Sequence, residues 1–191
     1  MSGGTPIPVV VSEVTPLNDL VTRFRFRRRD GLPFPAFSGG AHTVVEMDDH
    51  GTRRRNPYSL MGDPADTAAY SISVRRDDAG RVLSHPVNLF PLDLRARKHL
   101  FIAGGIGITP FLAMIHQCLR LGLRFELHYT ARTRALGAYM DDLERQHGRN
   151  VRLYLDDQDQ RLDLSGLLAR QPLGTALYVC GPKPMIAWVL A

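Results

Sequence analysis

A glycine-rich loop between an apolar strand and a helix constrains the fold of this 191-residue chain more than any other feature. The apolar run at 99–103 leads directly into the loop, and a helical pattern follows at 110–121. Glycines let a backbone turn tightly and approach a ligand closely, and a helix N-terminus offers free N–H groups and partial positive charge to phosphate. The loop comprises Gly104, Gly105, Gly107, Thr109 as a good N-cap, and Pro110 as a good first helical residue. This pattern favours a pyrophosphate-binding unit; the alternative is a turn that serves packing alone.

The pattern around the loop predicts two domains, residues 1–97 and 98–191. In the first, short alternating segments are separated by Gly, Pro and Asp, which predicts an antiparallel β-barrel or sandwich. Its strands are expected at 8–14, 21–27, 41–46, 55–60 and 70–75. In the second, apolar segments alternate with helical ones, which predicts βαβ units, a parallel sheet and a ligand site at the carboxyl ends of its strands. Its strands are expected at 99–103, 124–129, 151–155 and 176–180, and its helices at 110–121, 137–147, 164–170 and 183–190.

Composition and charge narrow the classes of partner. The net charge of +5 admits nucleic acid, a membrane surface or an acidic protein. In the basic run at 23–29, phenylalanines alternate with arginines, which is typical of a strand with one solvated face, so we expect no nucleic-acid partner. No apolar run reaches the length of a bilayer span and no secretory signal is evident, so we expect a cytoplasmic protein with no membrane partner. The two cysteines and seven scattered histidines predict no metal site in this chain.

Three motifs in order along the chain resemble the ferredoxin–NADP reductase superfamily. They are Arg-Asn-Pro-Tyr-Ser-Leu at 55–60, the glycine loop at 104–110, and Tyr-Val-Cys-Gly-Pro-Lys-Pro-Met at 178–185. The segments at 37–42 and 86–92 are similar to one branch, the reductases of phthalate dioxygenase and vanillate demethylase type. The resemblance implies a six-stranded antiparallel flavin-binding barrel followed by a five-stranded α/β parallel-sheet nucleotide-binding domain. It also implies FMN, as in this branch, with FAD as the alternative found in most others.

For the first domain, the resemblance implies a flavin site around the 55–60 motif. Arg55 is expected to hold the flavin phosphate, Tyr58 to pack against the isoalloxazine ring, and Ser59 to hydrogen-bond near flavin N5. The strand at 70–75 is expected to complete the site through the backbone of Ile72 and Val74 and a phosphate contact from Arg75. The alternative is that Tyr58 and Ser59 form an ordinary strand pair, one buried and one exposed.

For the second domain, the resemblance implies that Gly105, Gly107 and Thr109 face a nicotinamide dinucleotide, here NADH. The second loop contributes Cys180 beside the nicotinamide, Gly181 and Pro182, which shape the loop, and Met185. Hydride transfer needs no strong acid or base from the protein, because the cofactor carries the chemistry. Of the two catalytic candidates, Ser59 and Cys180, we therefore assign Cys180 a positioning role and not a nucleophilic one; the alternative is a small buried apolar residue.

Two further positions bear on the adenosine end of the dinucleotide. Arg132 follows the second strand of the parallel sheet, where it either meets the ribose or its phosphate or is a solvated loop residue. The acidic pair Asp156 and Asp157 ends the third strand, and a contact with the same ribose would favour NADH over NADPH.

The sequence departs from the family pattern in two places. Between positions 74 and 90 the chain is short: the usual Gly-Gly-Ser segment is absent, and residues 80–85 lead straight to Pro86 without a further barrel strand. The chain also stops inside a predicted helix, where a final strand of the sheet and then a 2Fe–2S ferredoxin domain with four cysteine ligands would follow. We expect a longer protein; the alternative is a degenerate subunit without flavin.

These features predict the reductase component of an oxygenase system. NADH reduces FMN, which passes single electrons to an iron–sulfur domain or ferredoxin and on to a terminal oxygenase component. A stand-alone NAD(P)H flavin reductase and a non-catalytic subunit on the same fold remain the alternatives.

Overall fold

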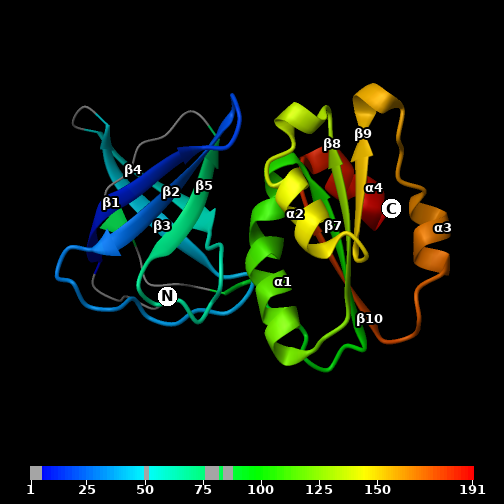
Figure 1. The fold of residues 1–191 in the computed structure, drawn as a ribbon, viewed down its shortest axis with the longest axis horizontal. Coiled ribbons are helices and arrows are strands. Elements are labelled where there is room, and N and C mark those ends of the chain that lie inside the picture. Colours follow the sequence, from blue (N-terminus) through cyan, green and yellow to red (C-terminus); the bar gives the residue numbers. More distant parts are fainter. Residues whose placement is uncertain (1–5, 50–51, 76–81, 84–87) are drawn as a thin grey trace.

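The computed structural model describes residues 6–49, 52–75, 82–83 and 88–191, and the two domains lie side by side (Figure 1). The first contains a six-stranded antiparallel sheet in the order β4-β3-β6-β1-β2-β5. An isolated antiparallel bridge between Met61 and Ser71 joins the two outer strands, so the sheet closes into the expected barrel. The strands are β1 (Ile7–Pro16), β2 (Val21–Arg28), β3 (His42–Asp49), β4 (Thr52–Ser59), β5 (Tyr70–Arg75) and β6 (Val82–Leu83).

Strand β6 corrects one sequence-based expectation. The short segment before Pro86 was expected to lack a barrel strand, but Val82 and Leu83 pair with β1 on one side and β3 on the other. Two residues are enough to fill this gap because both neighbouring strands are long and already held by other partners. The neighbouring positions 76–81 and 84–87, where the Gly-Gly-Ser segment would lie, are outside the described residues.

Alternation of apolar and charged side chains builds the barrel as predicted. Along β2, Phe26 is buried in the barrel core, while Arg23 and Arg25 pair with Glu13 and Asp66 at 2.9 and 3.2 Å. The basic run is therefore a solvated strand face with nearby carboxylates. The core of the barrel consists of Ile7, Val9, Phe26, Phe34, Ala41, Val45, Leu60, Tyr70, Ile72 and Val74.

The second domain is a parallel sheet of four described strands in the order β10-β7-β8-β9, with helices on both faces. The strands are β7 (Lys98–Gly104), β8 (Phe125–Ala131), β9 (Val151–Leu155) and β10 (Thr175–Cys180). The helices are α1 (Thr109–Leu121), α2 (Met140–His147), α3 (Leu164–Ala169) and α4 (Lys183–Leu190), with 3-10 turns η1 (Gly105–Ile108), η2 (Arg134–Leu136) and η3 (Asp156–Gln158). Helices α1 and α2 share one apolar core with the sheet, and α3 and α4 share the other. The fifth strand implied by the resemblance stays a prediction.

Two helix starts differ from the sequence-based prediction. Thr109 is not an N-cap: η1 runs into α1, Ile108 takes the cap position, and the Thr109 hydroxyl donates to the Ile106 carbonyl at 3.1 Å. The helix expected from position 137 begins only at Met140, because Tyr139 adopts a left-handed backbone with φ of 66° that an α-helix does not allow.

Polar contacts fix the barrel against the α1 face of the second domain, which adjoins it in Figure 1. The Gln117 side chain on α1 accepts a hydrogen bond from the Gly39 amide at 2.7 Å, and Arg120 pairs with Asp63 at 3.3 Å. Among the described residues, no helix is both long and apolar enough to cross a bilayer.

Candidate functional site

The carboxyl ends of the parallel strands form the edge at which the predicted nucleotide residues gather. Figure 1 shows the loops after β8 and β9 at the same end of the sheet. There the Asp157 amide donates to the Arg132 carbonyl at 3.0 Å, so these two expected ribose-facing positions are neighbours through the backbone. Both of their side chains are exposed.

The glycine loop has two glycines that the fold requires for different reasons. Gly105 has a left-handed backbone with φ of +54°, and an added Cβ would meet no atom within 4 Å. The space beside Gly105 is therefore open, and only its left-handed backbone conformation favours glycine at this position. At Gly107 an added Cβ would stand 2.2 Å from the Cys180 carbonyl oxygen and 2.7 Å from the Gly181 amide nitrogen. Position 107 requires glycine because a second loop packs directly against it and leaves no room for a side chain.

The loop after β10 is that second loop. Parallel pairing places Cys180 opposite Ala103, so the loops after β7 and β10 start side by side. A Cβ at Gly181 would lie 2.4 Å from the Met185 methyl group, and one at Gly104 would lie 2.6 Å from the Met185 sulfur. The Met185 side chain thus fills the space between the two loops, and Pro182 borders Gly104 on the same side, at 2.9 Å from its ideal Cβ.

Burial determines the ionisation of Cys180. The side chain is largely enclosed at the strand end, and burial raises the pKa of its thiol. The thiol is therefore protonated at neutral pH, which suits a small neutral positioning group and not a thiolate nucleophile.

On the barrel, the 55–60 motif lies on β4 and at its end. Tyr58 and Ser59 are both half-buried, and Tyr58 packs against the barrel core. The Arg55 side chain is 68% exposed and its Nε lies 3.8 Å from Glu46 Oε2, a long contact that leaves the guanidinium accessible. Ile72 and Val74 point into the core, so only their backbone can face a ligand, and Arg75 is exposed at the end of β5.

One contact between the domains was not predicted from the sequence. The Tyr139 hydroxyl lies 2.6 Å from the Ser73 hydroxyl on β5 and 3.7 Å from the sulfur of Met61, just beyond β4. Burial raises the pKa of Tyr139, so it stays a neutral hydrogen-bonding group. The loop that carries it is tied to the glycine loop, because the Tyr129 hydroxyl lies 3.0 Å from the Gly105 carbonyl and 3.1 Å from that of Ala138. No motif in the sequence marks Tyr139.

The structure thus brings together the two loops of the second domain and, through Tyr139, connects them to the strands that carry the barrel motif. Thr109 and Pro110 are buried at the start of α1, and the Thr109 hydroxyl donates to the Ile106 carbonyl within the glycine loop. Among the described residues, no cluster of His, Cys, Asp and Glu could hold a metal ion.

Comparison with known proteins identifies the family. A model of the N-terminal domain of dimethylamine monooxygenase subunit DmmA-like proteins matches residues 81–191. The chain belongs to this family.

Individual relatives agree. The chain is 41% identical to a carnitine monooxygenase reductase subunit of Acinetobacter baumannii over 96% of its own length and 62% of that protein's. It is 34% identical to the vanillate O-demethylase oxidoreductase of a Pseudomonas species, over 96% of this chain and 63% of that one. The solved phthalate dioxygenase reductase superposes with a TM-score of 0.86 at 29% identity, over 96% of this chain and 63% of its own. The expected resemblance is confirmed, and the chain spans somewhat less than two thirds of these relatives.

Proposed function

We propose that this chain is the flavin- and nicotinamide-nucleotide-binding part of a reductase component that delivers electrons from NADH to an oxygenase. Residues 1–97 would bind the flavin and residues 98–191 the nucleotide. The observation that carries the proposal is the direct packing of the glycine loop on the Cys180 loop, at a strand edge tied to the barrel by Tyr139 and Ser73. Family membership and the reductase names of the relatives support it.

The second domain fits a dinucleotide. The open space beside Gly105 lets a ligand approach the backbone, and η1 and then α1 follow directly in the chain, where a helix N-terminus offers free amide groups. Arg132 has an exposed guanidinium at this edge for the adenosine side, and Asp156 and Asp157 offer carboxylates for ribose hydroxyls. These acidic groups favour NADH over a nucleotide with a further phosphate.

Side chains of the barrel support a flavin that carries a phosphate group. The accessible Arg55 guanidinium suits a phosphate, and Arg75 lies exposed at the end of β5. Tyr58 and Ser59 are half-buried and supply an aromatic ring and a hydroxyl, and the chain just beyond them pairs with β5 through the bridge between Met61 and Ser71. We propose FMN; FAD is the alternative, and it would need an adenine site in addition.

The chemistry that the protein itself lacks, acceptance of a hydride from NADH and release of single electrons, would be supplied by a flavin held at Arg55, Tyr58 and Ser59. The chain has to hold two rings in register and exclude water from between them. Cys180 would border the nicotinamide with a small protonated thiol, and Tyr58 would flank the flavin. The Ser59 hydroxyl would hydrogen-bond near N5, and Tyr139 would keep the two domains in register.

Two arginines on β4 provide a sharp test of the flavin site. Arg53 and Arg55 are both exposed and both lie near Glu46, at 3.0 and 3.8 Å. We expect Arg55→Gln to weaken FMN binding by about 10- to 100-fold, as a lost charge-assisted hydrogen bond does. Arg53→Gln removes the same charge and should leave FMN affinity unchanged. Equal effects of the two variants in a fluorescence titration would contradict the role of Arg55.

The activity itself is tested by absorption spectra of the full-length protein before and after anaerobic addition of NADH. Flavin bands that bleach, together with iron–sulfur absorbance, are the expected result. Bleaching without an iron–sulfur signal would indicate a stand-alone flavin reductase. A protein that stays colourless after incubation with FMN and FAD would indicate a non-catalytic subunit.

A further inference from the structure

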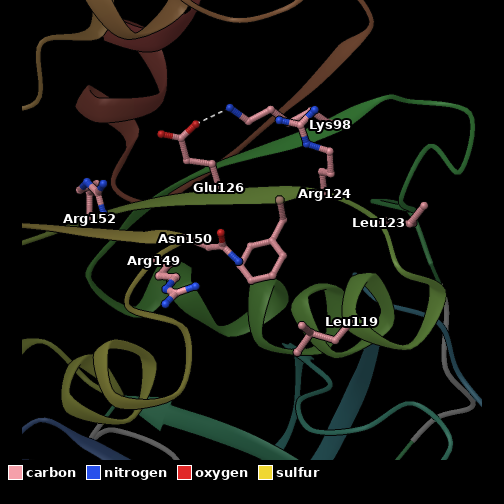
Figure 2. A pocket seen from close by; sticks show the side chains of 9 residues that line it. Lys98, Leu119, Leu123, Arg124, Glu126, Arg149, Asn150 and Arg152 are labelled. Atoms are coloured by element: carbon pink, nitrogen blue, oxygen red, sulfur yellow. Dashed lines mark hydrogen bonds and ion pairs between the residues drawn. The ribbon is translucent and has the colours of Figure 1, made fainter.

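A second hollow lies at the opposite end of the parallel sheet. It has a volume of about 380 Å³ and is lined by residues at the amino-terminal ends of three strands and at the end of α1 (Figure 2). Lys98 begins β7, Arg124 directly precedes β8, and Asn150 precedes β9. A seven-residue strand spans about 23 Å, so this hollow is separate from the carboxyl edge where the nucleotide residues gather.

The charge around the hollow is strongly unbalanced. Lys98, Arg124, Arg149 and Arg152 line it, with Glu126 as the one acidic residue among the lining side chains. In Figure 2, Lys98 and Arg124 lie on one side and Arg149 and Arg152 on the other.

The single carboxylate is already engaged. One oxygen of Glu126 accepts from Lys98, and the other lies 2.9 Å from His128 Nε2. Hydrogen bonds from Lys98 and His128 outweigh the effect of burial and hold the pKa of Glu126 below its ordinary value, so it is ionised. It neutralises Lys98, and no carboxylate among the described residues forms an ion pair with Arg124, Arg149 or Arg152.

These arginines differ from their neighbours in the same domain. Arg134, Arg145 and Arg161 each pair with a carboxylate. Among the described residues, neither Arg124 nor Arg149 forms an ion pair, and the Arg152 guanidinium donates to the backbone carbonyls of residues 148 and 151. Guanidinium groups that converge on one hollow repel one another, and a bound anion would relieve this repulsion.

Three apolar side chains and one amide complete the lining of the hollow. Leu119, Leu123, Phe125 and Asn150 line it together with the charged residues. An engineered apolar cavity of about 150 Å³ holds a benzene molecule, so a hollow more than twice as large has room for a ring with two acidic substituents. Small-molecule sites combine apolar surface with placed polar groups, and this hollow has both, with polar and charged residues in the majority.

We propose that this hollow binds a small organic dianion, an aromatic or branched body with two carboxylate or phosphate groups. Arg124 and Arg149 would each grip one acidic group through their paired N–H donors, and the body would rest on Leu119 and Leu123. This site is independent of the proposed flavin and nucleotide sites.

Isothermal titration of the full chain with isophthalate, at about 50 mM salt to limit screening, tests the proposal. Isophthalamide, which has the same ring but no charge, is the matched ligand. We expect saturable binding of isophthalate, none of isophthalamide, and no displacement of isophthalate by NADH. No saturable heat up to about 10 mM isophthalate, equal binding of the amide, or displacement by NADH would each overturn the proposal.

Two double variants locate the site. Arg124→Gln with Arg149→Gln should weaken isophthalate binding at least about tenfold. Arg145→Gln with Arg161→Gln removes the same net charge from exposed positions elsewhere in the domain and should leave the affinity unchanged. All four side chains lie at the surface, so unchanged circular dichroism is expected for both proteins. Equal affinity in the two double variants would overturn the assignment.

Discussion

Replacement of Gly107 by alanine tests the contact between the two loops most directly. The new Cβ would stand 2.2 Å from the Cys180 carbonyl oxygen, 2.5 Å from its carbon and 2.7 Å from the Gly181 nitrogen. A relaxed carbon–oxygen contact is near 3.3 Å, so the loops must separate by about 1 Å. The obstacle is a peptide unit and not a flexible side chain, and Cys180 is held by its pairing with Ala103.

The expected loss of stability follows from this geometry. Overpacking of this kind costs about 1–3 kcal/mol. Alanine gains up to about 1 kcal/mol over glycine in a helical backbone, which offsets part of the strain. The net loss of about 1–2 kcal/mol should lower the melting temperature by roughly 2–8 °C in a protein of this size. A 1 Å displacement of groups that position the reactants should also slow flavin reduction by NADH about 100-fold.

Thermal melting and anaerobic stopped-flow reduction measure the two effects. Gly148→Ala is the matched control, since its Cβ would lie 2.7 Å from the Glu144 carbonyl oxygen, at the far end of α2. It should strain the fold without slowing NADH oxidation. A Gly107→Ala protein that melts like the wild type and is reduced at the same rate would refute the argument.

Three further predictions concern single contacts and one titration. Gly105→Ala and Gly122→Ala both place alanine in a left-handed backbone, at φ of +54° and +64°, where the new Cβ meets no other atom within 4 Å. Each substitution should lower the free energy of unfolding, measured by denaturation, by about 1 kcal/mol. Only Gly105→Ala should also raise the KM for NADH. Tyr139→Phe and Ser73→Ala, combined in a double-mutant cycle, should show a coupling of about 0.5–1.5 kcal/mol, and strict additivity would contradict the hydrogen bond. Burial lowers the pKa of His128 from 6.5, so the unfolded chain binds more protons and the free energy of unfolding should fall as pH drops below about 6.5; a His128→Gln protein should lose part of this slope.

Much of the fold could be predicted because local patterns determine it. The alternation of apolar and polar residues in β2 and the short apolar runs of β7 to β10 both predict strands. The packing of the two domains follows those patterns. Strand β6 escaped prediction because two residues carry no period; only the space between β1 and β3 defines them. The prediction that Thr109 caps α1 was wrong because the glycines before it allow a 3-10 turn that continues into α1. No residue type in this segment predicts such a turn.

In the candidate site too, features set by local sequence could be predicted, whereas features set by contacts between distant residues could not. Sequence motifs identified the glycine loop and the Cys180 loop, and the structure places them in contact. The motifs did not reveal why Gly107 is glycine, since its constraint comes from a residue more than seventy positions away. Tyr139 was missed because a tyrosine in a left-handed conformation follows no propensity rule, and its partner lies in the other domain.

The hydrogen bonds of Tyr129 and Tyr139 form a continuous route from the Gly105 carbonyl to β5. A route of this kind can carry coupling between the two proposed ligands, and such coupling is reciprocal: if an occupied nucleotide edge changes flavin affinity by some factor, flavin must change nucleotide affinity by the same factor. If the coupling passes through the contact between Tyr139 and Ser73, Tyr139→Phe should bring that common factor closer to one.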